Sequence, residues 1–272
     1  MRRILTISII IIAGFSCTEE IGEPKFVVEG FIFAGEPVNN IKIKEQIEIG
    51  MPDSLENLIS NADVVLIKNN IEYALDFDNG KYKYFGNDLA IVSGDNFRLE
   101  VTVGDRIASA ETVVPQATTG LVISDLVITV PKIVLSFSLI EELTDLFWNA
   151  RSTVSWDNQN DELHFIVIES VEEEMDPLFP EGFPQNAKDF LSGFKFAPEA
   201  LEVDSFNIIG IAFDSYGRHR AKVYRVNSEY ADLFDNPKQD SRDLTTPPSN
   251  IVNGFGIFSA FAADSVFFDI VN

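Results

Sequence analysis

Short alternating segments separated by turn residues restrict the fold of this chain more than any other feature. Segments in which apolar and polar residues alternate cover residues 25–33, 41–49, 61–68, 97–103 and 107–114. Alternation with a period of two is typical of strands with one buried face, because successive side chains point to opposite sides. Asn79-Gly80 lies between two further alternating stretches and is a strong local signal for a β-hairpin. Turns at a spacing of about ten residues predict a β-sandwich domain, which we assign to residues 22–116.

The second half of the chain continues this alternation after a linker at residues 115–120. Residues 153–157 carry a tryptophan and alternate, and after a polar loop residues 163–169 alternate again. Together with the later segment at 221–227, this resembles the fibronectin type III pattern, in which a strand with a core tryptophan is followed by a strand that pairs with it. With 46% hydrophobic residues and 23 phenylalanines, the chain can fill substantial cores. We therefore predict an all-β protein of two β-sandwich domains, immunoglobulin-like or fibronectin type III-like, the second at residues 121–272.

A segment rich in phenylalanine and proline interrupts the predicted second domain at about residues 175–198. It is too long for a tight hairpin, and long loops with bulky apolar side chains are often functional. Two interpretations stay open: the aromatic rings pack back over the sandwich, or they form a surface for a ligand or partner. The candidates for that surface are Phe179, Phe183, Phe190 and Phe194.

The N-terminus has the organisation of a secretory signal peptide. Arg2 and Arg3 precede an apolar run at residues 4–13, and small residues follow directly before Cys17. The run has about half of the roughly 20 residues that a membrane-spanning helix needs, and no later stretch is long enough either. We predict a signal peptide at residues 1–16 and no permanent transmembrane helix.

Cys17 is the only cysteine of the chain, so it cannot form an internal disulfide. Residues 14–17 resemble a bacterial lipoprotein box, which implies that Cys17 becomes the diacylated first residue of the mature protein, with residues 17–21 as its tether. The alternative is a conventional signal peptide whose cysteine is removed or incidental. Glu19-Glu20 resembles an export signal of Bacteroidota surface lipoproteins. It predicts a lipid-anchored outer-membrane protein that faces the cell exterior, the alternative being the periplasmic face.

The charge of the chain argues against a nucleic-acid partner. The chain holds 43 acidic and 20 basic residues, a formal charge of −23, and loss of Arg2 and Arg3 with the leader makes this about −25. Nucleic-acid binding depends on Lys and Arg side chains that neutralise phosphates. We therefore predict that the partners are the outer membrane, through the lipid, and proteins or other ligands.

Residues for acid–base or metal chemistry are scarce. His164 and His219 are the only imidazoles, neither lies beside a nucleophile motif such as Gly-x-Ser-x-Gly, and no zinc-type ligand spacing occurs. We therefore predict no enzymatic activity, no catalytic residue and no cofactor. Oxygen ligands on turns leave a weaker calcium hypothesis, although Asp and Asn beside Gly are what any hairpin prefers. The calcium candidates are Asp76, Asp78, Asp157 and Asp161.

The C-terminal stretch at residues 246–260 is the most distinctive motif. Its Pro pair, Asn-rich turn and two glycines interleaved with phenylalanine predict a strand packed tightly against another element. With residues 27–30 and 111–115, it resembles a Bacteroidota outer-membrane lipoprotein family known as domain of unknown function 4249. Members are commonly encoded beside TonB-dependent receptors, which implies an accessory or binding role in an outer-membrane uptake system, with such a receptor as partner. The alternatives are an adhesive or glycan-binding surface module independent of any transporter, and a hydrolase that uses one of the two imidazoles.

Overall fold

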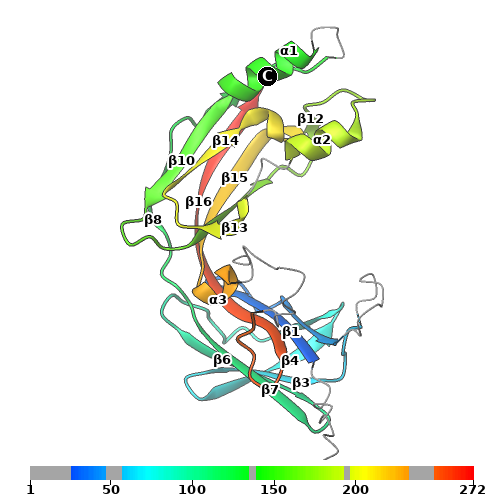
Figure 1. Cartoon of the computed structure of the whole chain (residues 1–272), viewed down its shortest axis with the longest axis vertical. Helices are drawn as coiled ribbons and strands as arrows, with labels where there is room; N and C mark the ends of the chain where they lie inside the picture. The colour runs from blue at the N-terminus through cyan, green and yellow to red at the C-terminus, as the bar shows by residue number, and fades with distance from the viewer. Residues whose placement is uncertain (1–25, 47–56, 135–138, 193–196, 233–247) are drawn as a thin grey trace, which may run out of the picture.

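The computed structural model describes residues 26–46, 57–134, 139–192, 197–232 and 248–272 of the chain. They form an elongated molecule of two β-rich lobes placed end to end, with the C-terminus at the far end of the second lobe (Figure 1). Strands make up most of both lobes, and the helices among the described residues are short. The all-β class predicted from the sequence is confirmed.

The first lobe is an antiparallel sheet that folds around its own core. Its strands neighbour one another in the order β1-β2-β5-β4-β3-β6-β7. Ser109 in β7 and Val252 exchange two backbone hydrogen bonds of 3.1 and 2.8 Å, so the segment before the C-terminal strand lies beside the last strand of the sheet. The strands are β1 (Phe26–Phe33), β2 (Ile41–Glu45), β3 (Asp63–Lys68), β4 (Ile71–Asp78), β5 (Lys81–Lys83), β6 (Asn96–Val103) and β7 (Arg106–Val113).

The apolar side chains of the alternating segments fill the core of the first lobe, as the sequence predicts. In β1, Phe26, Val28 and Ile32 are buried, and the residues between them, apart from Gly30, are half-buried. The predicted hairpin at Asn79-Gly80 joins β4 to β5, and both of its residues have positive φ (48° and 81°), as a two-residue turn of this type requires.

The second lobe is a sandwich of two sheets that share one core. A three-stranded sheet, in the order β14-β10-β8, faces a sheet in the order β13-β11-β15-β16. Strand β9 extends the larger sheet at β16, and β12 pairs with β15. The strands are β8 (Thr119–Ile123), β9 (Val127–Thr129), β10 (Arg151–Asp157), β11 (His164–Ser170), β12 (Asp176–Pro177), β13 (Ala197–Leu201), β14 (Ser205–Ile209), β15 (Ser215–Arg225) and β16 (Phe255–Val271).

The expectation that the tryptophan strand pairs with the strand after it is wrong. Strand β10, which carries Trp156, pairs with β8 and β14, whereas β11 lies in the facing sheet. Trp156 is 5% exposed and its ring lies 5.5 Å from that of His164 in β11. The loop between the two strands therefore crosses from one sheet to the other, which buries the indole between the sheets.

Short helices occupy the end of the second lobe and the junction. Helix α1 (Leu139–Asn149) precedes β10, and α2 (Gln185–Ser192) lies in the Phe- and Pro-rich segment. Both contact the 3₁₀ turn η1 (Gly210–Ala212), whereas α3 (Ser228–Ala231) lies where the lobes meet (Figure 1). No helix among the described residues has the length and hydrophobicity to cross a membrane.

The C-terminal strand β16 belongs to both lobes. Its first part pairs in parallel with β1, from Phe255 opposite Val27 to Phe261 opposite Phe33. From Ala262 onward it pairs antiparallel with β15. The predicted boundary between residues 116 and 121 overlaps the end of the segment that joins β7 to β8 and the start of β8. The sequence did not predict that the end of the chain completes the first lobe.

Aromatic rings from both lobes meet where β16 crosses between them. Phe261 of β16 is 2% exposed and stacks on Phe33 of β1, with ring centroids 5.0 Å apart. Phe165 of β11 stacks on Tyr224 of β15 at 4.7 Å, and Tyr230 in α3 contacts Phe261 edge-on at 5.0 Å. Such pairs stabilise by about 0.5–1.5 kcal/mol each beyond their buried area. We call these five rings the junction cluster, and together with β16 they join the two lobes.

Candidate functional site

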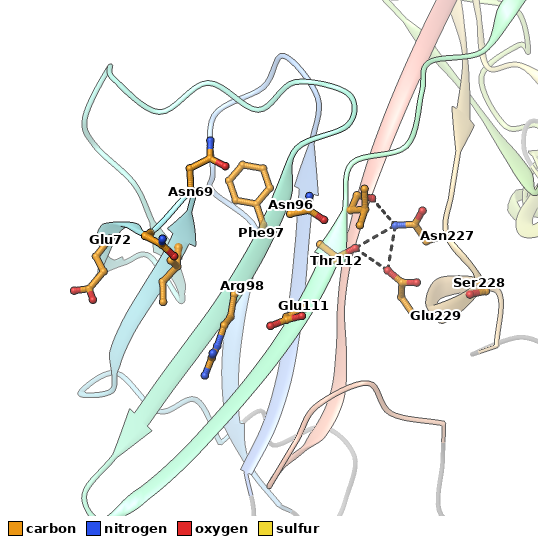
Figure 2. A pocket seen from close by; sticks show the side chains of 13 residues that line it. Asn69, Glu72, Asn96, Phe97, Arg98, Glu111, Thr112, Asn227, Ser228 and Glu229 are labelled. Carbon is orange, nitrogen blue, oxygen red and sulfur yellow. Dashed lines mark hydrogen bonds between the residues drawn. The ribbon is translucent and has the colours of Figure 1, made fainter.

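A groove of about 870 Å³ opens beside the junction, where strands of the first lobe face the segment that leads into α3 (Figure 2). Its lining residues lie within 67–72, 96–98, 111–113 and 227–229, and we call it the junction groove. Ligand sites commonly measure about 300–1,000 Å³ and favour domain interfaces. The junction groove is therefore the best candidate for a binding site among the described residues.

The β3–β4 turn forms one end of the junction groove. Asn69 and Asn70 both have positive φ (52° and 62°), the conformation of a tight two-residue hairpin in which asparagine is well tolerated. The turn brings both side chains to the groove, and Glu72 follows on β4. Across the groove floor, Arg98 of β6 lies directly opposite Glu111 of β7.

A hydrogen-bond network closes the other end and ties the lobes together. The Thr112 hydroxyl donates to Glu229 Oε1 at 2.7 Å, and Asn227 Nδ2 donates to the same oxygen at 3.1 Å, to Thr112 Oγ1 at 3.1 Å and to the Val113 carbonyl at 2.8 Å (Figure 2). Ser259 Oγ of β16 donates to Glu229 Oε1 at 3.4 Å. One carboxylate oxygen thus accepts from three side chains, two of which belong to β7 and β16, and this links α3 to both strands.

Several side chains that line the junction groove are available for hydrogen bonds with a bound molecule. The side chains of Asn69, Asn70 and Asn96 make no hydrogen bond to another described residue, and neither do those of Glu72 and Glu111. A primary amide offers two donors and one acceptor group, and a carboxylate offers acceptors only. The groove therefore presents both donors and acceptors to a bound molecule.

Two smaller hollows adjoin the junction groove along the same side of the molecule. One, of about 330 Å³, shares Val113, Asn227 and Ser228 with the groove. The next, of about 340 Å³, shares Glu162 and Arg225 with the first hollow and reaches the loop after β10. The three hollows follow the junction from the first lobe to the second.

Comparison with known proteins places the chain in a family. The family model described as "Domain of unknown function (DUF4249)" matches residues 15–266. The chain belongs to the DUF4249 family. No curated protein sequence matches it. Among solved structures, a two-domain fibronectin type III segment of chicken tenascin is similar over 90% of this chain and 98% of its own length, with 8% sequence identity and a TM-score of 0.25.

The aromatic residues predicted as a partner surface separate in this DUF4249 protein. Phe179 and Phe183 are buried in the second core, with ring centroids 4.6 Å apart. Phe190 on α2 is 69% exposed. Phe194 and the lipidation candidate Cys17 lie outside the described residues. Phe179 and Phe183 therefore pack back onto the sandwich, and the partner-surface interpretation stays a prediction for Phe190.

The calcium candidates lie in two separate places. Lys83 Nζ binds Asp78 Oδ2 at 2.6 Å, and this hydrogen bond lowers the pKa of the Asp78 carboxyl below its ordinary value of 3.8. Asp76 is opposite the same lysine across the hairpin. In the other lobe, Asp157 is the last residue of β10 and Asp161 lies in the loop that follows it. Among the described residues, no group of three or more His, Cys, Asp or Glu side chains could hold a metal ion.

Both imidazoles pack inside the second lobe. His164 and His219 are each 2% exposed, and in each ring Nδ1 lies 2.9–3.0 Å from a backbone carbonyl two residues earlier. Because a carbonyl only accepts, Nδ1 carries the proton in the neutral ring. Burial lowers the pKa of His164 below its ordinary value of 6.5, and the nearby Arg225 charge acts in the same direction.

The depressed pKa of His164 predicts acid-dependent stability. Below about pH 6.5 the unfolded chain binds a proton at this site that the folded protein does not, so the free energy of unfolding falls as the pH falls. We expect His164→Gln to reduce that dependence by as much as about 1.4 kcal/mol per pH unit. Urea unfolding of both proteins between about pH 7.5 and about pH 5 measures it. Equal slopes would show that His164 does not contribute.

Sequence reasoning missed the junction groove. Thr112 and Asn227 lie far apart in the chain and come from different lobes, so no local pattern joins them. The Asn69-Asn70 pair was the available signal, because adjacent asparagines between alternating segments indicate a tight turn. That signal locates a turn but does not identify its side chains as part of a site.

Proposed function

We propose that this DUF4249 protein is a surface-exposed lipoprotein that acts without enzymatic activity, as a binding or accessory component of an outer-membrane uptake system based on a TonB-dependent receptor. The junction groove is its ligand site in this proposal. The immunoglobulin-like architecture is compatible with a binding role. Beyond a binding role, the proposal specifies a lipid tether, a location at the cell surface and a TonB-dependent receptor as partner.

The direction of β1 is the observation that carries the proposal. Val27 pairs with the start of β16 and Phe33 pairs with Phe261 at the junction, so β1 begins at the end of the first lobe that is remote from the second. A lipid at Cys17 would precede Phe26 by nine residues, a span of at most about 30 Å. The first lobe would then lie next to the membrane, and the junction groove and second lobe would extend away from it.

Copurification from the native membrane tests the proposal. We expect gentle detergent extraction to recover a receptor barrel with the wild-type chain, because lipid and partner hold both proteins in one complex. Mass spectrometry of the purified wild-type protein is the control for the tether, and it should find an acylated Cys17 at the N-terminus after loss of residues 1–16. If the wild-type chain never recovers a barrel, the accessory role fails; if Cys17 is bare or still attached to an uncut leader, the lipid anchor fails.

A second function, favoured by the polar junction groove, is an adhesive or glycan-binding module that works without any transporter. It has the same tether and the same site. Saccharide binding by a protein that never copurifies with a barrel, and whose gene has no receptor gene beside it, would select this function.

A further inference from the structure

The open side chains of the junction groove match one kind of ligand chemistry. The amides of Asn69, Asn70 and Asn96 face the groove without a hydrogen bond to any described residue. Each amide both donates and accepts, and a sugar hydroxyl also donates one hydrogen bond and accepts two. Amides and hydroxyls therefore complement one another in several orientations, which suits a ligand that carries many hydroxyl groups.

Charge excludes acidic ligands from the junction groove. Glu72, Glu111 and Glu229 line it, and the guanidinium of Arg98 is already paired with Glu100 at 2.7 Å. The chain as a whole has a formal charge of −23. A phosphate, sulfate or uronate would be repelled by this field, whereas neutral hydroxyls can donate to the carboxylates.

The arrangement of the groove also disfavours a basic peptide. Its three carboxylates come from β4, β7 and α3, and no described group of three acidic side chains converges on one point. Peptide interfaces depend on bulky anchors that enter apolar pockets. The aromatic ring of the groove, Phe97, is 1% exposed, and Val113 at 48% is the lining residue with substantial apolar exposure.

The adjoining hollows extend the same chemistry into the second lobe. Gln116, Gln159 and Asn160 line the hollow beyond Arg225. Thr118 lines it as well, and its buried hydroxyl has no hydrogen-bond partner among the described residues. A buried polar group of this kind is normally satisfied by water or a ligand. The polar surface therefore continues beyond the junction groove, along the junction and into the second lobe.

We propose that the junction groove binds a neutral oligosaccharide, which extends along the adjoining hollows and bridges the two lobes. The proposal rests on the proposed binding role of the groove and adds the ligand class. The Asn amides bind the hydroxyls by paired donation and acceptance, the carboxylates accept from further hydroxyls, and the exposed part of Val113 contacts a C–H face of the sugar.

Calorimetric titration of the purified lipoprotein in detergent tests the proposal. The probes are neutral oligosaccharides, uronate-containing oligosaccharides and a lysine-rich peptide, each at concentrations up to about millimolar. We expect neutral oligosaccharides alone to bind. The variant pair Asn70→Gly with Asn96→Ala should weaken that binding about tenfold or more, since several hydrogen bonds are lost. Asn70→Gly leaves the turn intact, because glycine accepts the φ of 62°.

Two controls separate the possible outcomes. Asn79→Gly makes the same change at the β4–β5 turn (φ 48°), which does not line the groove, and should leave affinity unchanged. Glu111→Gln keeps a side-chain oxygen that accepts from a sugar hydroxyl, so the affinity for a neutral saccharide should fall less than about threefold, whereas a cationic ligand would lose about tenfold or more. Binding of the peptide with this loss overturns the ligand class but keeps the groove as a site. The saccharide site is overturned if no probe binds, or if the Asn variants bind saccharide as tightly as wild type does. The accessory role is tested separately, by copurification with a receptor barrel.

Discussion

Ending the chain after Asn253 is expected to unfold both lobes. The deletion removes β16, and β1 in the first lobe and β15 in the second each lose a neighbouring strand. Large buried side chains are lost from both cores and from the junction cluster: Ile257, Phe258, Phe261, Phe268 and Ile270. At about 2 kcal/mol for each buried side chain, the loss is about 10 kcal/mol, which equals the whole net stability of a typical domain.

Circular dichroism and hydrogen exchange measure this effect. The wild-type protein should show a cooperative thermal transition and protected amides in β1, β6 and β15, and the shortened chain should show neither. Adding a peptide of residues 249–272 should restore part of the protection, because the same strand is then supplied by a separate molecule. Protection of β6 in the shortened chain that equals that of wild type would contradict the dependence of the first lobe on β16.

The shared strand also has a consequence for folding. Val27 pairs with Phe255, so contacts of the first lobe join residues from nearly opposite ends of the sequence. Closing so long a loop costs conformational entropy before the contacts form, and non-local strand pairing slows folding. The first lobe therefore completes its sheet only after the last residues of the chain are available.

The sequence predicted most of the local structure because local structure is what alternation and turn residues encode. The strands of the first lobe and the Asn79-Gly80 hairpin are confirmed, and residues 248–260 do lead into a strand packed closely against another element. In that motif, the side-chain amide of Asn250 bonds to both backbone groups of Phe258, at 2.7 and 2.9 Å, in the way that a neighbouring strand would.

The double role of β16 escaped prediction for a physical reason. Ile257 to Ala262 are buried without alternation, because each face of the strand is covered as it passes the junction. A run of this kind indicates burial but does not name the neighbouring strands. The hydrogen-bond network of Thr112, Asn227 and Glu229 could not be predicted for a similar reason. A contact between lobes depends on how the lobes are placed, and no local repeat in the sequence encodes that placement.

Replacing Gly256 by alanine is expected to have the second large effect. Gly256 has a φ of +103° and lies opposite Val28 in the β1–β16 pairing. An added Cβ would lie 2.0 Å from the Val28 carbonyl oxygen, which is backbone and cannot move without breaking the pairing. We expect a loss of about 3 kcal/mol or more in the free energy of unfolding, and a fall of about 6–12 °C in Tm.

Gly35→Ala is the matched control for this substitution. Gly35 also has a positive φ, +75°, but an added Cβ would meet nothing within 4 Å. Its substitution should therefore lower the free energy of unfolding only by the cost of holding alanine in this backbone conformation, about 1 kcal/mol. Urea and thermal unfolding of the two variants separate that cost from the overlap with Val28. If both variants lose the same stability, the close approach of β16 to β1 does not determine the effect, and the first lobe tolerates a looser pairing than the structure implies.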